Sequence, residues 1–321
     1  MRAALAFTVA VIIAVCAEPV RADPPTFDFA WGTMGSEPGQ FWAPIAIHII
    51  PDGSMYVAEF GNARVQKFDG TGAHVTMWGE FGFDDGQFAG PMGVATDAQG
   101  NVYVVERDNH RIQKFDAQGT FLLKWGSWGS EEDGAFVYPR GIAMTPDEKV
   151  LVVDASGRVQ EFDVDGRFVR KWGSPGTGPG QFRAASGIAL DQLGNIYIVE
   201  EGNRRVQKFD RAGTFQTTWG RQGTGNGEFR CPQAIAVHNN HVYVTDGCLN
   251  RVQRFDTNGV FQLVWGQTGT ADGEFDTPQG IATDAQGNAL VCDYINNRIQ
   301  RFVYPLAVER PSWTDAKKVY R

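Results

Sequence analysis

Short apolar runs alternate with glycine-rich polar turns along almost the whole chain, and the alternation repeats at a nearly fixed interval. The dipeptide Trp-Gly marks the interval, at a spacing of 47 residues four times and 46 residues once. Each unit contains four apolar runs separated by turn residues, which predicts four short strands, here called a to d. In the second unit, strands a, b and c are expected at 91–95, 102–106 and 111–116, with strand d ending at Trp125. The marker tryptophans are Trp31, Trp78, Trp125, Trp172, Trp219 and Trp265.

Four antiparallel strands in a repeat of this length predict one blade of a β-propeller, and six repeats predict a six-bladed, all-β ring. The segment 27–32 has the pattern of a strand d with no blade before it, whereas the last unit stops after strand c near Phe302. We therefore expect the N-terminal strand to complete the last blade. Closure makes residues 23–304 one domain without a free inner edge, and we expect a monomer.

Both ends of the chain differ from the repeat. Arg2, the apolar run 3–16 and the small residues up to Ala22 predict a signal peptide at 1–22, and hence a secreted or periplasmic protein. An alternative makes Cys16 a lipid-modified residue, although Val15 before it does not fit such a signal. No mature segment is apolar over the roughly 20 residues that a membrane helix needs. Residues 305–321 form a tail, in which a capping pattern from Ser312 to Asp315 predicts a short helix.

The net charge of −8 bears on the class of partner that the chain can bind. Nucleic-acid binding draws its affinity from clustered basic residues, so a nucleic-acid partner is not expected. The sequence identifies no cofactor, and it contains no nucleophile elbow, phosphate loop or zinc-binding helix motif.

The segments 62–69, Asn-Ala-Arg-Val-Gln-Lys-Phe-Asp, and 109–116, Asn-His-Arg-Ile-Gln-Lys-Phe-Asp, resemble NHL repeats, as does the Val-Tyr-Val-Val-Glu run before the second of them. The resemblance covers nearly the whole mature chain and implies the six-bladed propeller. Proteins of this kind include amidating lyases, extracellular sensor domains and the recognition propellers of tripartite-motif ubiquitin ligases. The last group carries zinc modules that four scattered cysteines without a CxxC pair cannot build.

Features present in every unit are expected to hold the fold together, and features that break the symmetry are expected to serve function. An acidic residue ends each strand b and an arginine begins each strand c, which predicts six bidentate ion pairs. The pairs are Glu59–Arg64, Glu106–Arg111, Asp154–Arg158, Glu200–Arg205, Asp246–Arg251 and Asp293–Arg298. The repeated tryptophan and phenylalanine side chains are expected to pack between blades.

Residues outside the repeated pattern are concentrated in the loops from strand d to strand a and from strand b to strand c, which share one face. Aromatic and arginine side chains there predict a site for a protein, peptide or carbohydrate ligand. The candidates are Arg140, Trp128, Tyr138, Trp42, Phe60, Arg107, Tyr294, Arg183 and Arg230. Arg140 is the leading candidate, because it stands at the first position of strand a, where the other blades have Ile45, Met92, Ser186, Gln233 and Gln279. These six positions are expected to ring the central channel.

The resemblance to the amidating lyases raises an alternative function, a metal-dependent lyase or hydrolase. In those enzymes histidines at the start of strand a hold zinc, but none of the five histidines of this chain stands there. We therefore assign no catalytic or metal-binding residue and favour a recognition scaffold. Cys231 and Cys248 resemble a disulfide of those lyases, and an oxidising compartment would allow the bond. Cys292, inside the last strand b, is expected to be a small buried apolar residue.

Overall fold

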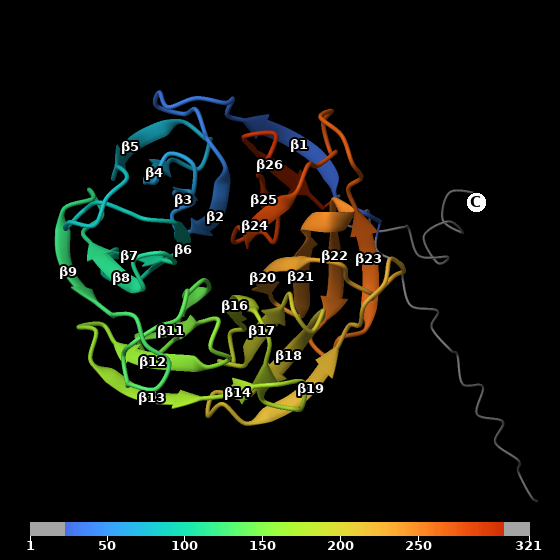
Figure 1. Ribbon diagram of the computed structural model, residues 1–321. Helices are drawn as coiled ribbons and strands as arrows, with labels where there is room; N and C mark the ends of the chain where they lie inside the picture. The colour runs from blue at the N-terminus through green and yellow to red at the C-terminus, as the bar shows by residue number, and fades with distance from the viewer. Residues whose placement is uncertain (1–22, 305–321) are drawn as a thin grey trace, which may run out of the picture.

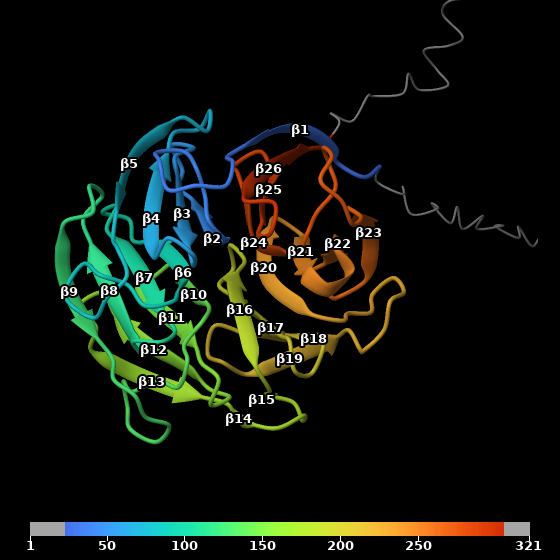
Figure 2. The same ribbon diagram turned by 45° about the horizontal axis from the view of Figure 1, so that its top comes forward.

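The computed structural model describes residues 23–304, which form six four-stranded antiparallel sheets arranged around a central axis (Figure 1). The predicted six-bladed β-propeller is therefore confirmed. Figure 2 shows the same ring tilted, with the blades side by side around the opening. The signal peptide predicted at 1–22 and the helix predicted within 305–321 lie outside the described residues.

Each blade runs from an innermost strand a to an outermost strand d. The first blade contains β2 (Pro44–Ile49), β3 (Met55–Glu59), β4 (Arg64–Phe68) and β5 (His74–Trp78). The second contains β6 (Pro91–Thr96), β7 (Val102–Glu106), β8 (Arg111–Phe115) and β9 (Phe121–Trp125). The third contains β10 (Ile142–Met144), β11 (Lys149–Val153), β12 (Val159–Asp163) and β13 (Phe168–Trp172).

The second half of the ring repeats this order. The fourth blade contains β16 (Ala185–Leu190), β17 (Ile196–Glu200), β18 (Arg205–Phe209) and β19 (Phe215–Trp219). The fifth contains β20 (Pro232–His238), β21 (His241–Asp246), β22 (Arg251–Asp256) and β23 (Phe261–Trp265). The sixth contains β24 (Pro278–Thr283), β25 (Ala289–Asp293), β26 (Arg298–Val303) and β1 (Thr26–Trp31). Outside the blades lie the short parallel pair β14 (Ser174–Pro175) and β15 (Gln181–Phe182) and the 3-10 turn η1 (Gly247–Leu249).

The two ends of the described chain close the ring. Strand β1 pairs antiparallel with β26, and Phe27 lies opposite Phe302 in the register (Figure 1). The rings of these two residues pack edge to face at 6.3 Å. The expectation that the N-terminal strand completes the last blade is confirmed.

The hydrophobic core lies between the blades rather than within them. Each of the six buried clusters combines side chains of two neighbouring blades; Val65 of the first blade, for example, packs with Val102 and Phe115 of the second. The marker tryptophans span the same junctions, and the ring of Trp78 lies 5.8 Å from that of Phe115 in the next blade. The predicted packing between blades is confirmed, and the buried Cys292 belongs to one of these clusters.

Antiparallel topology divides the loops between two faces. The d-to-a and b-to-c loops emerge on one face, here called the upper face, and the a-to-b and c-to-d turns emerge on the lower face. The upper-face loops are fixed by a buried carboxylate. In the second blade, Glu106 Oε1 accepts hydrogen bonds from Arg111 Nε at 2.6 Å and from Gln113 Nε2 at 2.8 Å. Its Oε2 accepts from the Asn109 side chain and from the backbone N–H of Ala89.

The arginine and the glutamine of this network extend it into the d-to-a loop. Arg111 donates its terminal N–H groups to the carbonyl oxygens of Phe83, Asp84 and Gln87. Gln113 accepts from the N–H of Gly86 at 2.9 Å. The loop is thus bound through its backbone, and no loop side chain is needed for the contact.

The network repeats around the ring, but its geometry corrects the prediction of bidentate ion pairs. In five blades only Nε of the arginine contacts the carboxylate. The terminal nitrogens donate to loop carbonyls instead. In the fifth blade Arg251 Nε has no partner among the described residues, and its NH2 stands 4.0 Å from Asp246. The glutamine binds a loop N–H in all six blades, a role that the sequence analysis missed.

Replacing Arg205 by alanine tests the contribution of this network. Arg205 donates to Glu200 at 2.6 Å and to three loop carbonyls. Because the change leaves a buried carboxylate unpaired, we expect Arg205→Ala to lower the free energy of unfolding by about 3–5 kcal/mol in urea titrations. The matched control is Arg167, whose side chain is 79% exposed on the lower face. Arg167→Ala should change the free energy of unfolding by less than about 0.5 kcal/mol. Equal effects of the two changes would contradict this account.

Candidate functional site

The six innermost strands surround the axis of the ring (Figure 1). Residues of these strands line a cavity of about 100 Å³. As the sequence predicted, the first positions of these strands line it together. They are Ile45, Met92, Arg140, Ser186, Gln233 and Gln279. Below them small residues let the strands approach closely: a Cβ on Gly141 would lie 3.1 Å from the Cα of Gly187 in the next blade. The cavity is small beside the roughly 300–1,000 Å³ of typical ligand sites, so the channel mouth offers more room than the channel.

Among residues 23–304, Arg140 is the only charged residue that lines this channel. Its NH1 donates to Glu201 Oε2 at 3.0 Å, and the two side chains are 27% and 35% exposed. Glu201 directly follows β17 of the fourth blade, so the ion pair spans two blades across the mouth. The Nε of Arg140 is buried and has no partner among residues 23–304. Arg140 therefore keeps donors beyond those that its ion pair uses.

Four other candidate residues, Phe60, Arg107, Tyr138 and Tyr294, lie in loops of the upper face. The guanidinium of Arg107 lies 4.9 Å over the ring of Phe60. The pKa of Arg107 is raised chiefly by its hydrogen bonds to Asp108, at 2.8 Å, while burial opposes the rise. Three of these candidates come from b-to-c loops and Tyr138 from a d-to-a loop. The four side chains therefore belong to loops of the first, second, third and sixth blades on the same face.

Tyr138 adopts a backbone conformation that bulky residues seldom take. Its φ is +47°, and its side chain is 48% exposed. At the same position of the loop, the first, second and fourth blades have Ala43, Gly90 and Ala184, all with positive φ. An exposed aromatic residue held in a strained conformation is typical of binding sites.

His110 holds Tyr138 in place. Its Nδ1 accepts a hydrogen bond from the backbone N–H of Tyr138 at 3.1 Å, and the two rings lie 4.9 Å apart. The same position is taken by Asn250 and Asn297, whose Oδ1 atoms accept from the following loops in the same way. Burial lowers the pKa of His110, in keeping with an unprotonated Nδ1, although Asp108 opposes the shift. The sequence analysis assigned His110 no role; its signal was the alignment with these asparagines.

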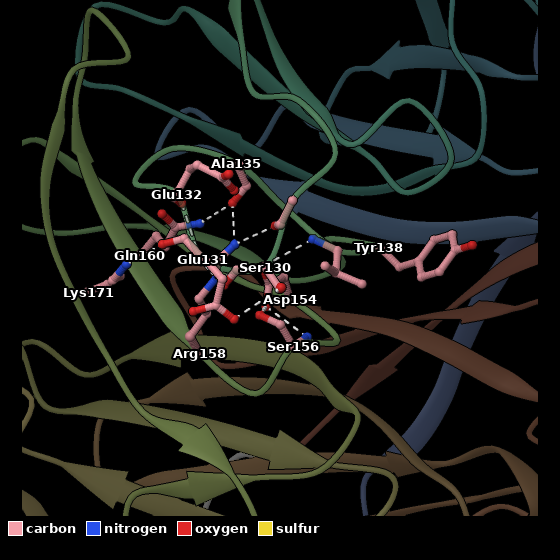
Figure 3. Close-up of polar contacts among 12 residues, drawn as sticks. Ser130, Glu131, Glu132, Ala135, Tyr138, Asp154, Ser156, Arg158, Gln160 and Lys171 are labelled. Atoms are coloured by element: carbon pink, nitrogen blue, oxygen red, sulfur yellow. Dashed lines mark hydrogen bonds and ion pairs between the residues drawn. The ribbon is translucent and has the colours of Figure 1, made fainter.

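The two candidate tryptophans lie at different places. Trp42 is 52% exposed and lies over Gly61, where a Cβ would come within 2.5 Å of the indole. Gly61 follows Phe60, so Trp42 lies beside the b-to-c loop that carries Phe60. Trp128 is 73% exposed but stands three residues after the outermost strand β9, and it lines neither the channel nor the cavity described next. Figure 3 shows Tyr138 directed away from the buried contacts of Asp154 and Arg158, which anchor the same loop.

A second cavity, of about 300 Å³, opens between the fourth and fifth blades. Its lining residues are Arg183, Ala184, Glu201, Gly202, Arg204, Arg230 and Cys231. The candidates Arg183 and Arg230 therefore line this cavity together, away from the axial channel. Glu201 lies between the two cavities, because it also pairs with Arg140.

The expected disulfide between Cys231 and Cys248 is present, with 5.2 Å between the Cα atoms. It joins the d-to-a loop of the fifth blade to η1, the 3-10 turn that stands in place of the ordinary b-to-c loop. Leu249 occupies the position of the asparagine that binds the carboxylate in the second blade. The disulfide therefore fixes the loop where the polar network is weakest.

Removing both cysteines tests this compensation. The double change Cys231→Ser and Cys248→Ser should lower the free energy of unfolding by about 3 kcal/mol, because the bridge closes a short loop. Urea unfolding of the wild type in reducing agent should match that of the double variant without it. An unchanged unfolding midpoint in the double variant would show that the bridge does not stabilise the fold.

The contact between His110 and Tyr138 predicts a dependence on pH. The folded pKa of His110 lies below the ordinary value of about 6.5, so the unfolded chain takes up the proton first and stability is lost as the pH falls below that value. We expect the wild type to lose about 1 kcal/mol more than His110→Asn between pH 7.5 and 5.5, because asparagine keeps the acceptor without titrating. The other histidines are common to both proteins and cancel. Parallel pH profiles would contradict the assignment.

Among residues 23–304, no three His, Cys, Asp or Glu side chains are placed to hold a metal ion. None of the helical segments in this range has the length and apolar character needed to span a bilayer.

Comparisons with known proteins agree with the fold. The NHL repeat model matches residues 88–115, 229–255 and 275–302, in the second, fifth and sixth blades. No match to a curated protein was found.

Three solved structures illustrate the likeness. A protein of unknown function from Bacteroides thetaiotaomicron is 19% identical, with a TM-score of 0.63, over 87% of this chain and 73% of the other. Virginiamycin B lyase from Staphylococcus aureus is 15% identical, with a TM-score of 0.58, over 81% of this chain and 94% of the enzyme. A chain of a nidogen–laminin complex is 15% identical, with a TM-score of 0.54, over 79% of this chain and 84% of the other. Such identities show the fold alone, and this chain is a six-bladed β-propeller that carries NHL repeats.

Proposed function

We propose that this chain is an exported recognition propeller that binds a protein, peptide or carbohydrate ligand on its upper face. The observation that carries the proposal is the placement of exposed aromatic side chains. All five strongly exposed aromatic residues of the described chain lie in upper-face d-to-a loops. They are Trp42, Phe81, Phe83, Trp128 and Tyr138. Exposed aromatic residues are enriched in recognition sites because they bury much apolar surface at little cost in side-chain entropy.

The geometry of the channel mouth supports a site centred there. Phe60, Arg107, Tyr138 and Tyr294 lie in loops of the upper face, where Arg107 stacks on Phe60. Arg140, which lines the channel, adds a charged pair with Glu201. The loops that present these residues are fixed through their backbones, so little conformational entropy is lost when a ligand binds. Mixed aromatic, cationic and anionic groups suit a polar ligand with one apolar side.

Export is supported by two independent features. Residues 1–22 have the pattern of a signal peptide, and Cys231 and Cys248 form a disulfide. Stable disulfides belong mainly to oxidising compartments outside the cytosol.

The alternative, a metal-dependent lyase or hydrolase, is supported by the fold, which virginiamycin B lyase shares. Fold likeness assigns no residue of this chain a catalytic role. The observed mouth, with its aromatic and arginine side chains, favours recognition.

Binding to glycan and peptide arrays tests the proposal, with Tyr138→Ala as the site variant. Alanine occupies the equivalent position in the first and fourth blades, so this change should leave the fold intact. We expect array ligands of the wild type to lose affinity by about tenfold or more in Tyr138→Ala, because exposed aromatic anchors dominate such interfaces.

The matched control is Leu193→Ala, which removes a side chain that is 85% exposed on a lower-face turn. It should bind the same ligands as the wild type. Blank arrays, ligands that bind Tyr138→Ala unchanged, or equal losses in both variants would contradict an upper-face site.

A further inference from the structure

We propose that the cavity between the fourth and fifth blades is an oxyanion-binding site, which takes a carboxylate, sulfate or phosphate group of the ligand. This inference rests on the proposed upper-face recognition and names one chemical group of what is recognised. Three arginines, Arg183, Arg204 and Arg230, line the cavity of about 300 Å³. The two blades stand side by side in the ring (Figures 1 and 2).

The cavity holds more positive than negative charge. The only acidic residue of the described chain that lines it is Glu201, which already pairs with Arg140 at 3.0 Å. Among residues 23–304, none of the three lining arginines has a carboxylate oxygen within 4.0 Å, whereas most other arginines of the propeller are paired. In a chain with a net charge of −8, such a cluster of unpaired guanidinium groups is a local exception. Guanidinium groups without a carboxylate partner favour an anionic ligand.

Arg204 is the residue that makes this cavity different from the other junctions. Its φ is +53°, and it occupies the loop position that Asn250 and Asn297 take in the fifth and sixth blades. Those asparagines accept a hydrogen bond from the following d-to-a loop, but an arginine has no acceptor to offer. Arg204 makes only a 3.3 Å contact with the Gly202 carbonyl, and its Nε is buried without a partner among the described residues. Arg204 therefore does not accept a hydrogen bond from the next loop, and its guanidinium group has N–H donors without a partner among the described residues.

The neighbouring blade compensates for this exchange. The backbone N–H of Cys231, which an asparagine at position 204 would be placed to bind, donates instead to Asp246 Oδ1 at 2.9 Å. Asp246 also accepts from the N–H of Arg230 and stands 4.0 Å from Arg251, which loses the Nε contact seen in the other blades. Burial raises the pKa of Asp246, and these loop N–H groups partly offset that effect. The disulfide of Cys231 then fixes the wall of the cavity.

The first and third blades have Ala63 and Gly157 at this position, so the loss of the acceptor is not special to the fourth blade. Among the described blades, the rearranged carboxylate and the disulfide occur only at this junction, beside the cavity that Arg204 lines. A side chain that only covered loop backbone would not need a rearranged carboxylate and a disulfide beside it. Three guanidinium groups can donate paired hydrogen bonds to the oxygens of one acidic group. The cavity volume, at the lower end of the range for small-ligand sites, suits one such group and the residue or sugar that carries it.

Calorimetric titration with three sodium salts tests the site. Sulfate and phosphate probe tetrahedral oxyanions and acetate probes a carboxylate, each at constant ionic strength because salt screens exposed charges. We expect saturable binding of at least one anion with a Kd on the order of 1 mM, and the arm that binds identifies the group. Arg204→Asn should weaken the affinity for that anion by about tenfold or more, because a charge-assisted hydrogen-bond donor is lost. Asparagine occupies this position in two other blades, so the variant should keep the backbone conformation.

Arg167→Asn, on the lower face, is the matched control and should bind like the wild type. Absence of saturable heat with all three anions, unchanged binding by Arg204→Asn, or an equal loss in Arg167→Asn would overturn the inference. The array experiment with Tyr138→Ala separates the two proposals. If array ligands depend on Tyr138 but no anion binds, only the proposal of an oxyanion site is contradicted. If an anion binds but no array ligand does, the proposed recognition function is contradicted and the oxyanion site stands.

Discussion

A buried carboxylate at the end of each strand b is the group on which the upper face depends. Removing a carboxylate from water is costly unless hydrogen bonds replace the lost solvation. In the second blade Glu106 meets this requirement with four donors, from an arginine, a glutamine, an asparagine and a loop amide. The arginine and the glutamine then bind loop backbone, so each blade carries its d-to-a loop in a fixed position. Because these contacts use only backbone atoms of the loop, the loop side chains are free to differ among blades.

This separation explains how a repetitive fold carries a site without symmetry. The repeated residues lie below the loops and between the blades, whereas Tyr138, Arg107 and Arg204 occupy positions that the network leaves unconstrained. In the fifth blade the carboxylate network itself is altered. There the carboxylate Asp246 turns toward the loop amides, the arginine contact lengthens to 4.0 Å, and a disulfide takes over part of the anchoring.

The sequence predicted the fold well because every physical signal was repeated six times. The spacing of the tryptophans gave the number of blades, and the unpaired N-terminal strand gave the closure. The chemistry of the arginines was harder to predict: a strand pairing shows that Arg111 and Glu106 meet, but not that loop carbonyls compete for the guanidinium. That the candidate residues bind a ligand stays a prediction. Arg140 lines the channel and Arg107 stacks on Phe60, but Trp128 lines neither cavity, because distance from the axis depends on how a loop crosses the blade. Arg204 and His110 were missed, since only their three-dimensional neighbours distinguish them from ordinary loop residues.

The most direct test of the central claim is hydrogen exchange of the loop that leads into the fourth blade, compared between the wild type and Glu200→Gln. In the wild type, the N–H of Arg183 donates to Glu200 and that of Gly180 donates to Gln207. If the carboxylate network fixes the loop, these amides should exchange at least about tenfold faster in the variant, while the amides within β17 and β18 remain protected. Unchanged protection of the loop, or an equal loss throughout the blade, would contradict the account.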